Sequence, residues 1–429
     1  MSKKYIHNNE ANSYGGGDII IDVLRKRGIP EFINSYLGER HPRAEYSYSE
    51  GIFHYFIAQC RGAKRIENMY DCRDDLKNHP NFGKGMSPDT YLYMCKELAR
   101  PNKYYKKENI SEKLAKKIEK GKAFDSHEVN TIEKYNEWLV DTLILLGFLK
   151  VGGRYILDYD TTDIETKHKH SRRYYKGNGK KAYCPAVAMI NKMPVYIENR
   201  NGDSNASFKL TQTIDSILNL LSKKGIIVDV IRIDAAGFSK EFTEFVNAKG
   251  LKYVTRAKYT TVKNEKEFIR NWTETTIKKC TNEIGDNVFH FGKDETRMIV
   301  KKVIEKDGAV RYWGLITNEF DKSNAEIINL YAQRGDCENL FSALNEFSWD
   351  VLPMRKFEHN TVYLYLTAFN YILYKFITNL FESKTPRVWQ NMELKTFIDK
   401  FMAVPTMWIK NKLRFLKRAR EYMILLEFT

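Results

Sequence analysis

The sequence lacks the cysteine pattern of a zinc site or of a disulfide framework. Its six cysteines are scattered over 429 residues, and no two have a Cys-x-x-Cys spacing. We therefore expect neither a structural zinc ion nor a disulfide framework, and a reducing cytoplasm fits this composition. Long apolar runs are scarce too. Residues 1–17 are polar, so we expect no signal peptide. The most apolar stretch, residues 362–381, contains Asn370, Lys375 and four tyrosines, which favours a buried helix over a membrane span.

Positive charge, in contrast, is abundant. The chain has 70 Lys and Arg against 54 Asp and Glu, which gives a formal net charge of +16. Such an excess indicates a polyanionic partner, most simply nucleic acid, and a small neutral metabolite would not require it. With 43% hydrophobic residues, the chain can bury a sizeable core, so we expect two or three folded domains.

The first part of the chain, residues 1–150, is predicted to be helical. Ser87-Pro88 is a helix start, because Ser caps a helix and Pro suits its first position. The helical patterns over residues 63–76 and 91–99 fit either a helix-turn-helix that contacts a DNA groove or an ordinary helix pair. Residues 100–122 carry nine Lys and Arg against three Glu. This run, which includes Lys106 and Lys107, can neutralise phosphates, although most charged runs are only solvated surface.

A different pattern begins near residue 151 and predicts a mixed α/β region. Its elements follow the order β-β-β-α-β-α-β, with Asn191-Lys192 as a hairpin turn between the second and third strands. The apolar spacing places the strands at 155–160, 182–190, 193–198, 226–233 and 251–256, and the helices at 207–224 and 240–248. Short strands and polar turns follow over residues 257–320. A helix is predicted over 325–347, and residues 360–429 are predicted to be helical and basic.

Three acidic residues stand out by their context. Asp160 ends the first of these strands, Asp234 follows the fourth, and Glu338 lies on the helix after the β-rich segment. The carboxyl ends of strands are where open α/β folds place their sites. Grouped carboxylates repel one another unless cations lie between them, and Mg²⁺ prefers such oxygen ligands. An Asp at a strand end is also a common turn former. Asp158 shares a face with Asp160, but Asp160 is followed by Thr161-Thr162, where the strand ends.

The helix with Glu338 carries two further candidates. Tyr331, Arg334 and Glu338 are spaced i, i+3 and i+7, which places them on one helix face. Arg334 can hold a phosphate in bidentate fashion, and Tyr331 can stack on a base. The simplest alternative is a solvent-facing salt bridge between Arg334 and Glu338.

A cluster of basic and aromatic residues follows the first acidic position. Cations can bind phosphates and aromatic rings can stack on bases, so this mixture is typical of a nucleic-acid surface. The cations that we expect to contact DNA there are Lys167, Lys169, Arg172 and Arg173.

These three acidic segments resemble a DDE transposase of a bacterial insertion sequence, in the branch with a Tyr-x-x-Arg-x-x-x-Glu-x-x-x-x-x-x-Lys helix. The resemblance covers nearly the whole chain and is most specific in the segments LDYDTTD (157–163), IRIDAAGF (231–238) and YAQRGDCEN (331–339). It implies an α/β fold with a ribonuclease H-like mixed sheet, flanking helices, a β-rich insertion before the last catalytic helix, and helical N- and C-terminal regions. The domains implied are a DNA-binding region over 1–150, the core over 151–256 and 321–358, the insertion over 257–320 and the basic C-terminal region over 359–429.

The resemblance also implies roles for individual residues. Asp160, Asp234 and Glu338 are the implied catalytic and metal-binding triad, and Tyr331 and Arg334 are the implied DNA contacts. One position departs from the pattern, because the family's Lys falls at Asn345, whose neutral amide cannot supply the positive charge. A nearby Lys, such as Lys356, is a candidate substitute.

The function implied is that of an insertion-sequence transposase. Such an enzyme cleaves double-stranded DNA at terminal inverted repeats and transfers the freed 3′-hydroxyl into target DNA. The expected cofactor is a pair of Mg²⁺ ions, with Mn²⁺ as a substitute. The expected assembly is a homodimer on paired ends, in the bacterial cytoplasm at the nucleoid, with no membrane and no small-molecule substrate. The alternatives are a ribonuclease H-like DNA nuclease without strand transfer and an inactive DNA-binding derivative.

Overall fold

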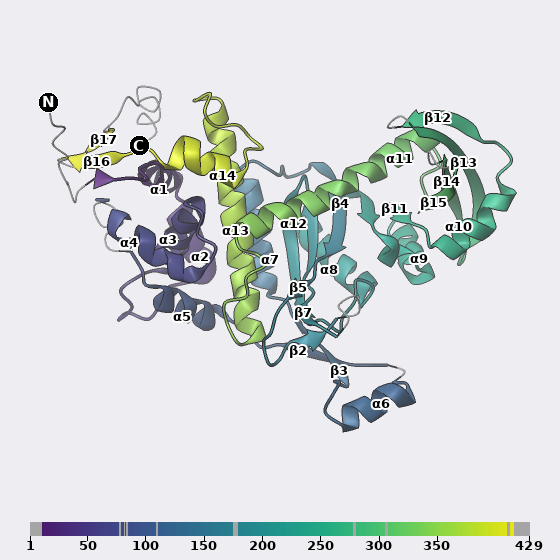
Figure 1. Ribbon diagram of the computed structural model, residues 1–429, viewed down its shortest axis with the longest axis horizontal. Coiled ribbons are helices and arrows are strands. Elements are labelled where there is room, and N and C mark those ends of the chain that lie inside the picture. The colour runs from purple at the N-terminus through teal and green to yellow at the C-terminus, as the bar shows by residue number, and fades with distance from the viewer. Residues whose placement is uncertain are drawn as a thin grey trace.

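The computed structural model describes residues 11–415, except for 77–78, 81, 83–84, 109, 175–178, 278–279, 305–307 and 410–411. Figure 1 shows three parts: a helical part at the two chain ends, a central sheet, and a β-rich lobe on the opposite side of that sheet. Within the described residues, no helix combines the length and apolar character needed to cross a bilayer.

The helical part is built by both ends of the chain. Ser47 begins one of its helices with a reciprocal capping box to Glu50, and Ser87 caps the predicted helix start at Pro88. The long helix α13 packs against α3, α5 and α7 (Figure 1). These elements are α1 (Gly16–Lys26), α2 (Ile29–Leu37), α3 (Tyr48–Cys60), the 3₁₀ turn η1 (Ile66–Met69), α4 (Tyr70–Leu76), α5 (Pro88–Leu98), α7 (Glu133–Leu145) and α13 (Phe357–Glu382).

The C-terminal region is helical only in its first part. After α13 come the short helix α14 (Leu394–Phe397) and the π-helical turn η5 (Ile398–Met402). The chain then forms strands β16 (Thr406–Ile409) and β17 (Lys412–Phe415). Strand β16 pairs with β1 (Ala11–Asn12), so the expectation of helix throughout residues 360–429 was wrong. Such a pairing between the two chain ends leaves no local signal in the sequence.

The central sheet confirms the predicted ribonuclease H-like order of elements. Strand β10 lies between β4 and β11 and is parallel to both, whereas β8 and β9 continue the sheet antiparallel on the far side of β4. Asn191 and Lys192 form the hairpin turn with φ of 51° and 64°. The elements are β4 (Arg154–Thr161), β8 (Ala186–Ile190), β9 (Met193–Arg200), α8 (Leu210–Lys223), β10 (Ile227–Ile233), α9 (Lys240–Ala248) and β11 (Lys252–Arg256).

The β-rich insertion extends this sheet directly. Strand β15 pairs antiparallel with β11, so the insertion and the core share one sheet of 11 strands. The segment therefore has the predicted β content but continues the hydrogen-bonded ladder of the core. Its elements are α10 (Tyr259–Glu265), the 3₁₀ turn η3 (Lys266–Phe268), β12 (Thr273–Ile277), β13 (Cys280–Phe291), β14 (Asp294–Ile304) and β15 (Val310–Thr317).

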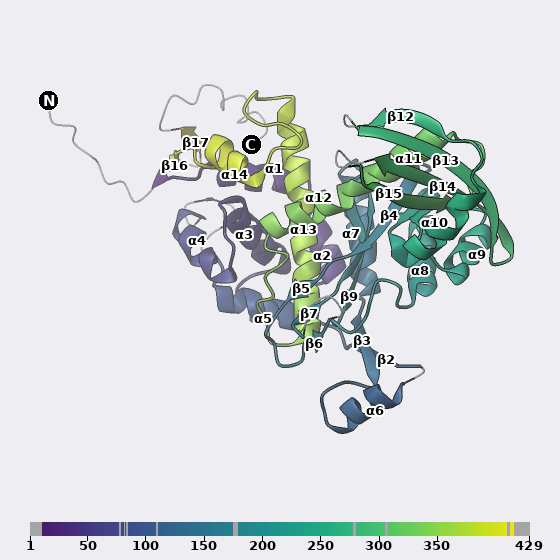
Figure 2. The same ribbon diagram turned by 45° about the vertical axis from the view of Figure 1, so that its right-hand side comes forward.

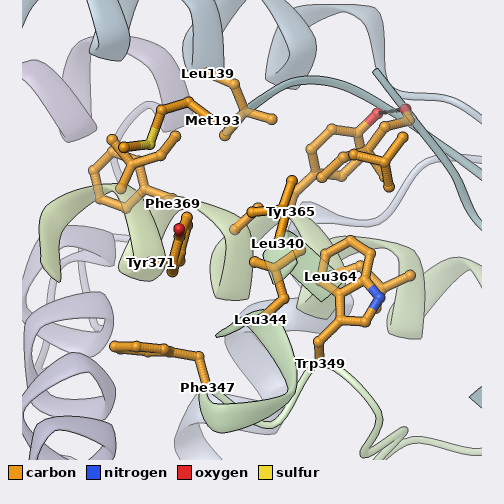
Figure 3. Packing of buried hydrophobic residues seen from close by; sticks show 14 of the residues in the cluster. Leu139, Met193, Leu340, Leu344, Phe347, Trp349, Leu364, Tyr365, Phe369 and Tyr371 are labelled. Carbon is orange, nitrogen blue, oxygen red and sulfur yellow. Dashed lines mark hydrogen bonds between the residues drawn. The ribbon is translucent and has the colours of Figure 1, made fainter. Parts of the chain in front are cut away.

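The helix predicted over 325–347 is broken in the structure. It consists of α11 (Asn324–Ala332), the 3₁₀ turn η4 (Gln333–Gly335) and α12 (Asp336–Glu346). The prediction of one straight helix was therefore wrong. Glycine at position 335 weakens a helix interior, which favours a break at this point. Helix α12 itself is held firmly, because Leu340, Leu344 and Phe347 are buried against α13, as Figure 3 shows.

Residues 103–130 form an arm that projects from the body of the molecule (Figure 2). Its two strands, β2 (Lys103–Lys106) and β3 (Ser126–Asn130), join the edge of the large sheet through β9. Its helix, α6 (Glu112–Glu119), buries none of its residues. The arm thus belongs to the sheet and not to the helical part, although it lies within the region 1–150. A small sheet of β5 (Ile164–Glu165), β7 (Lys181–Tyr183) and β6 (Arg172–Arg173) follows β4 along the chain.

Candidate active site

The first two acidic positions meet at one edge of the central sheet. In the parallel pair β4–β10, Asp158 lies opposite Arg232 and Tyr159 opposite Ile233, so the next residues along the two strands are Asp160 and Asp234. Asp160 lies at the end of β4, and Asp234 follows β10 directly. The structure therefore brings these two residues together as expected.

Local hydrogen bonds fix both carboxylates. Asp160 Oδ1 accepts the Thr161 N–H at 2.9 Å. Asp234 Oδ1 accepts the Ala236 N–H at 2.8 Å and so caps the 3₁₀ turn η2 (Ala235–Gly237). Gly237 is required in that turn, because a Cβ atom there would lie 1.9 Å from Ile233 Cγ2. Each acid is thus both a turn former and a candidate ligand.

Glu338 completes the set from the first turn of α12. Burial raises the pKa of Asp160, and the charges of Asp234 and Glu338 raise it further, whereas Arg334 and the Thr161 N–H lower it. The charges of Asp234 and Glu338 therefore act on Asp160, although Glu338 itself is exposed. Repulsion of this kind is relieved when a cation lies between the acids.

Arg334 supplies such a cation in this structure. Its Nη2 lies 2.8 Å from Asp160 Oδ2, and the side chains of Arg334 and Asp160 are only 12% and 16% exposed. Arg334 therefore pairs with Asp160 of strand β4. The alternative, a solvent-facing salt bridge between Arg334 and Glu338, is not what the structure shows. Arg334 Nε is buried and has no hydrogen-bond acceptor among the described residues. One donor of the guanidinium therefore remains for another acceptor.

The chemistry of this site suits a hard divalent cation. All three candidate ligands are carboxylates, which are the oxygen donors that Mg²⁺ prefers. In the part of the chain that the structure describes, however, no three acidic, histidine or cysteine side chains lie close enough to hold a metal ion as they stand. The guanidinium of Arg334 lies on Asp160, so it occupies a position where a cation would neutralise that acid.

The remaining helix positions are arranged around this centre. Tyr331 is half-buried and packs against the hydrophobic cluster that contains Leu315 and Ile327, and burial raises the pKa of its hydroxyl. Asn345 is one of the last residues of α12. The ammonium group of Lys64 lies 3.3 Å from the carbonyl oxygen of Asn345 and 2.9 Å from that of Glu346. A positive charge is therefore present next to Asn345, although it comes from Lys64 and not from the helix.

The expected DNA-contacting cations fall into two groups. Lys106, Lys167, Lys169 and Arg173 are exposed. Two others support the arm instead: Lys107 Nζ lies 2.6 Å from Asp203 Oδ2, and the buried Arg172 pairs with the same carboxylate at 3.2 Å. The structure thus separates free cations from those already engaged within the fold.

A model of the family described as transposase DDE domain group 1 matches residues 12–417 of this chain. The chain belongs to the DDE transposase family. It is therefore a transposase, an enzyme that cleaves DNA by phosphoryl transfer, and enzymes of this family use divalent metal ions. No curated protein matches the chain. Among solved structures, the chain is similar to a piggyBac transposase in a synaptic complex with hairpin DNA, seen by cryo-electron microscopy. That likeness has 12% identity and a TM-score of 0.42, and it covers 90% of this chain and 77% of the other.

Sequence reasoning missed two features of this transposase. The first is the ion pair between Asp158 and Arg232. The sequence contained a clue to this pair, because each of the two residues lies two positions before a candidate acid. The second is the position of Lys64, which is remote in sequence from Asn345 and left no signal.

Proposed function

We propose that this transposase cuts the ends of its own insertion sequence and joins them to target DNA at the site formed by Asp160, Asp234 and Glu338. The observation that carries this proposal is the position of Asp160 and Asp234 at one sheet edge, with Arg334 on Asp160 at 2.8 Å and Glu338 in the following helix turn. Both reaction steps are phosphoryl transfers, so the protein mainly has to position strands and stabilise charge.

The proposed cofactor is a pair of Mg²⁺ ions, which Mn²⁺ can replace. Asp160, Asp234 and Glu338 would hold these ions, because they are the grouped oxygen donors of the site. When bound, two such ions activate the attacking oxygen and stabilise the leaving one. The chain's own residues orient the DNA: Arg334 leaves Asp160 for a phosphate of the scissile region, and Tyr331 contacts the neighbouring nucleotide.

The proposed DNA surface follows the exposed cations. Lys106 on the arm and Lys167, Lys169 and Arg173 after β4 are exposed and free to bind phosphates. Lys107 and Arg172 contribute by fixing the base of the arm through Asp203. At Asn345, Lys64 provides the positive charge that the amide lacks. We expect this surface to bind terminal inverted repeats and target DNA at the bacterial nucleoid.

The direct test is cleavage of DNA that carries the element ends. We expect Asp234→Asn and Glu338→Gln to lose cleavage by at least about a thousandfold, since each removes a ligand of the ions that stabilise the transition state. Asp336→Asn is the matched control, because Asp336 lies on the same helix but pairs with Lys192 at 3.1 Å. Full activity in either triad variant would rule out the proposed site.

Two further functions remain in competition with strand transfer. A nuclease would cut the ends but would not join pre-cut ends to a target, so a strand-transfer assay separates the two. An inactive DNA-binding derivative would bind ends without cutting them in Mg²⁺ or Mn²⁺. Paired ends require two protomers, and the mass of the protein–DNA complex measures whether a homodimer forms.

A further inference from the structure

We propose that the buried ion pair between Asp158 and Arg232 is the device that positions Arg334 and Glu338 against the strand acids. This inference rests on the proposed function, because it concerns the same site. Neither residue belongs to the triad. Asp158 and Arg232 lie two residues before Asp160 and Asp234, on the same face of the sheet.

The pair joins both acid-bearing strands. Arg232 Nε donates to Asp158 Oδ1 at 2.7 Å, and Arg232 Nη2 donates to Asp158 Oδ2 at 2.6 Å. Both side chains are 6% exposed. A bidentate contact of this kind fixes orientation as well as distance. It therefore stabilises the register between β4 and β10. That register determines how Asp160 and Asp234 lie relative to each other.

The third branch of Arg232 reaches the helix. Its Nη1 donates to the carbonyl oxygen of Leu330 at 2.6 Å and to Gln333 Oε1 at 3.4 Å. Leu330 is near the end of α11, and Gln333 begins the 3₁₀ turn that contains Arg334. The guanidinium thus holds the break between α11 and α12. Since Glu338 lies in the first turn of α12, the position of that break decides where Glu338 points.

Stability alone does not account for this arrangement. Removing two charges from water is costly, and hydrophobic replacements for a buried ion pair are often neutral or stabilising. Burial raises the pKa of Asp158, even though Arg232 lowers it. What an apolar pair cannot supply is the directed contact to Leu330 and Gln333. We therefore treat Arg232 as a positioning residue that acts through η4.

The experiment compares a double variant, Asp158→Leu with Arg232→Met, with the wild-type protein. We expect the double variant to melt at or near the wild-type temperature, because no buried charge is left unpaired. We expect its kcat for end cleavage to fall about 10- to 100-fold, and its affinity for Mn²⁺ without DNA to fall by a similar factor. The KM for end DNA should stay within about twofold, since the pair does not contact DNA.

Arg232→Lys is a second variant that keeps the positive charge. It tests the inference even if the double variant does not fold. Lysine cannot make the bidentate contact and also reach Leu330, so we expect lower kcat and weaker Mn²⁺ binding from a folded protein. Wild-type kcat and Mn²⁺ affinity in either folded variant would overturn the inference. If the wild-type protein itself neither binds Mn²⁺ nor cuts ends, the proposed function fails instead, and the two failures are thereby distinguished.

Discussion

Two aspartate–arginine pairs lie on the same face of this sheet, one pleat apart, and they differ in how completely they are satisfied. Asp158 and Arg232 are 6% exposed and make two mutual hydrogen bonds, while Arg232 also binds the helix. Asp160 and Arg334 are 16% and 12% exposed, share one contact at 2.8 Å, and leave Arg334 Nε without an acceptor among the described residues.

We interpret this difference as that between a structural pair and one that the proposed function uses. Both oxygens of Asp158 are held by Arg232, so a metal ion at Asp158 would have to compete with this bidentate ion pair. The partly bonded pair can exchange each member for a ligand, with the carboxylate accepting a cation and the guanidinium accepting a phosphate. We therefore propose different roles for Asp158 and Asp160, which lie on the same strand but differ in how fully they are hydrogen-bonded.

The largest predicted effect comes from exchanging each aspartate for asparagine. Asp160→Asn should lower end cleavage by about a thousandfold or more, while the melting temperature falls by about 1 °C or less, because Arg334 loses only one contact and burial already disfavours the charged carboxylate. Asp158→Asn should lower the melting temperature by about 3 °C, because Arg232 loses its charged partner. Calorimetry and cleavage assays on both variants measure this contrast. Similar melting temperatures for the two variants would contradict the distinction between the pairs.

The strand-end positions of two of the acids could be predicted from sequence, because they depend on local pattern. Asp160 and Asp234 end strands whose apolar residues identify them, and the order of elements makes β4 and β10 parallel neighbours. The choice of Asp160 over Asp158 also rested on a local feature, the two threonines where the strand ends. Residues that mark the ends of regular elements are therefore the ones that sequence reasoning places well.

What could not be predicted depends on contacts between distant segments. The break at η4 lies where Arg232, 98 residues earlier, takes the Leu330 carbonyl. Lys107 and Arg172 have the same composition signal as Lys106 and Arg173, but in the fold both pair with Asp203. Sequence composition counts charges, but it does not show which charges are already paired.

Replacing Arg334 tests the role of the arginine in the pair between Asp160 and Arg334. Arg334→Gln should increase the affinity of the free protein for Mn²⁺ by about tenfold, because loss of a partly buried ion pair of about 1.4 kcal/mol leaves Asp160 free. The same variant should bind end DNA more weakly. Lys192→Gln is a suitable control, since Lys192 pairs with Asp336 on the same helix. Titration with Mn²⁺ in the absence of DNA gives the measurement, and unchanged or weaker binding would show that Arg334 does not compete with the ion.

Lys64 provides a smaller test at the other end of α12. If its ammonium group supplies the charge missing at Asn345, Lys64→Ala should weaken the binding of end DNA by about three- to tenfold. The slope of log affinity against log salt concentration should also fall by about one, which corresponds to the loss of one phosphate contact. The second change Asn345→Lys should restore binding to the Lys64→Ala protein. Binding curves at several salt concentrations measure both effects. A lowered melting temperature with unchanged DNA affinity would identify Lys64 as a helix cap only.

The smallest effect concerns a buried aspartate that has no arginine partner among the residues that the structure describes. Asp18 is fully buried, and its Oδ2 accepts hydrogen bonds from Asn12 at 2.9 Å and from Thr406 at 3.0 Å. Burial raises its pKa, although His79, Trp408 and these two neighbours lower it.

A raised pKa means that the folded protein holds the proton of Asp18 more tightly than the unfolded chain does. Its stabilising contribution is thus complete below the unfolded value of about 3.9 and is lost as the pH rises through the folded pKa. Asp18→Asn cannot lose a proton, so the melting temperature of the wild type minus that of the variant should decrease from pH 4 to pH 7. A difference that stays constant over this range would mean that the pKa of Asp18 in the folded protein is not raised.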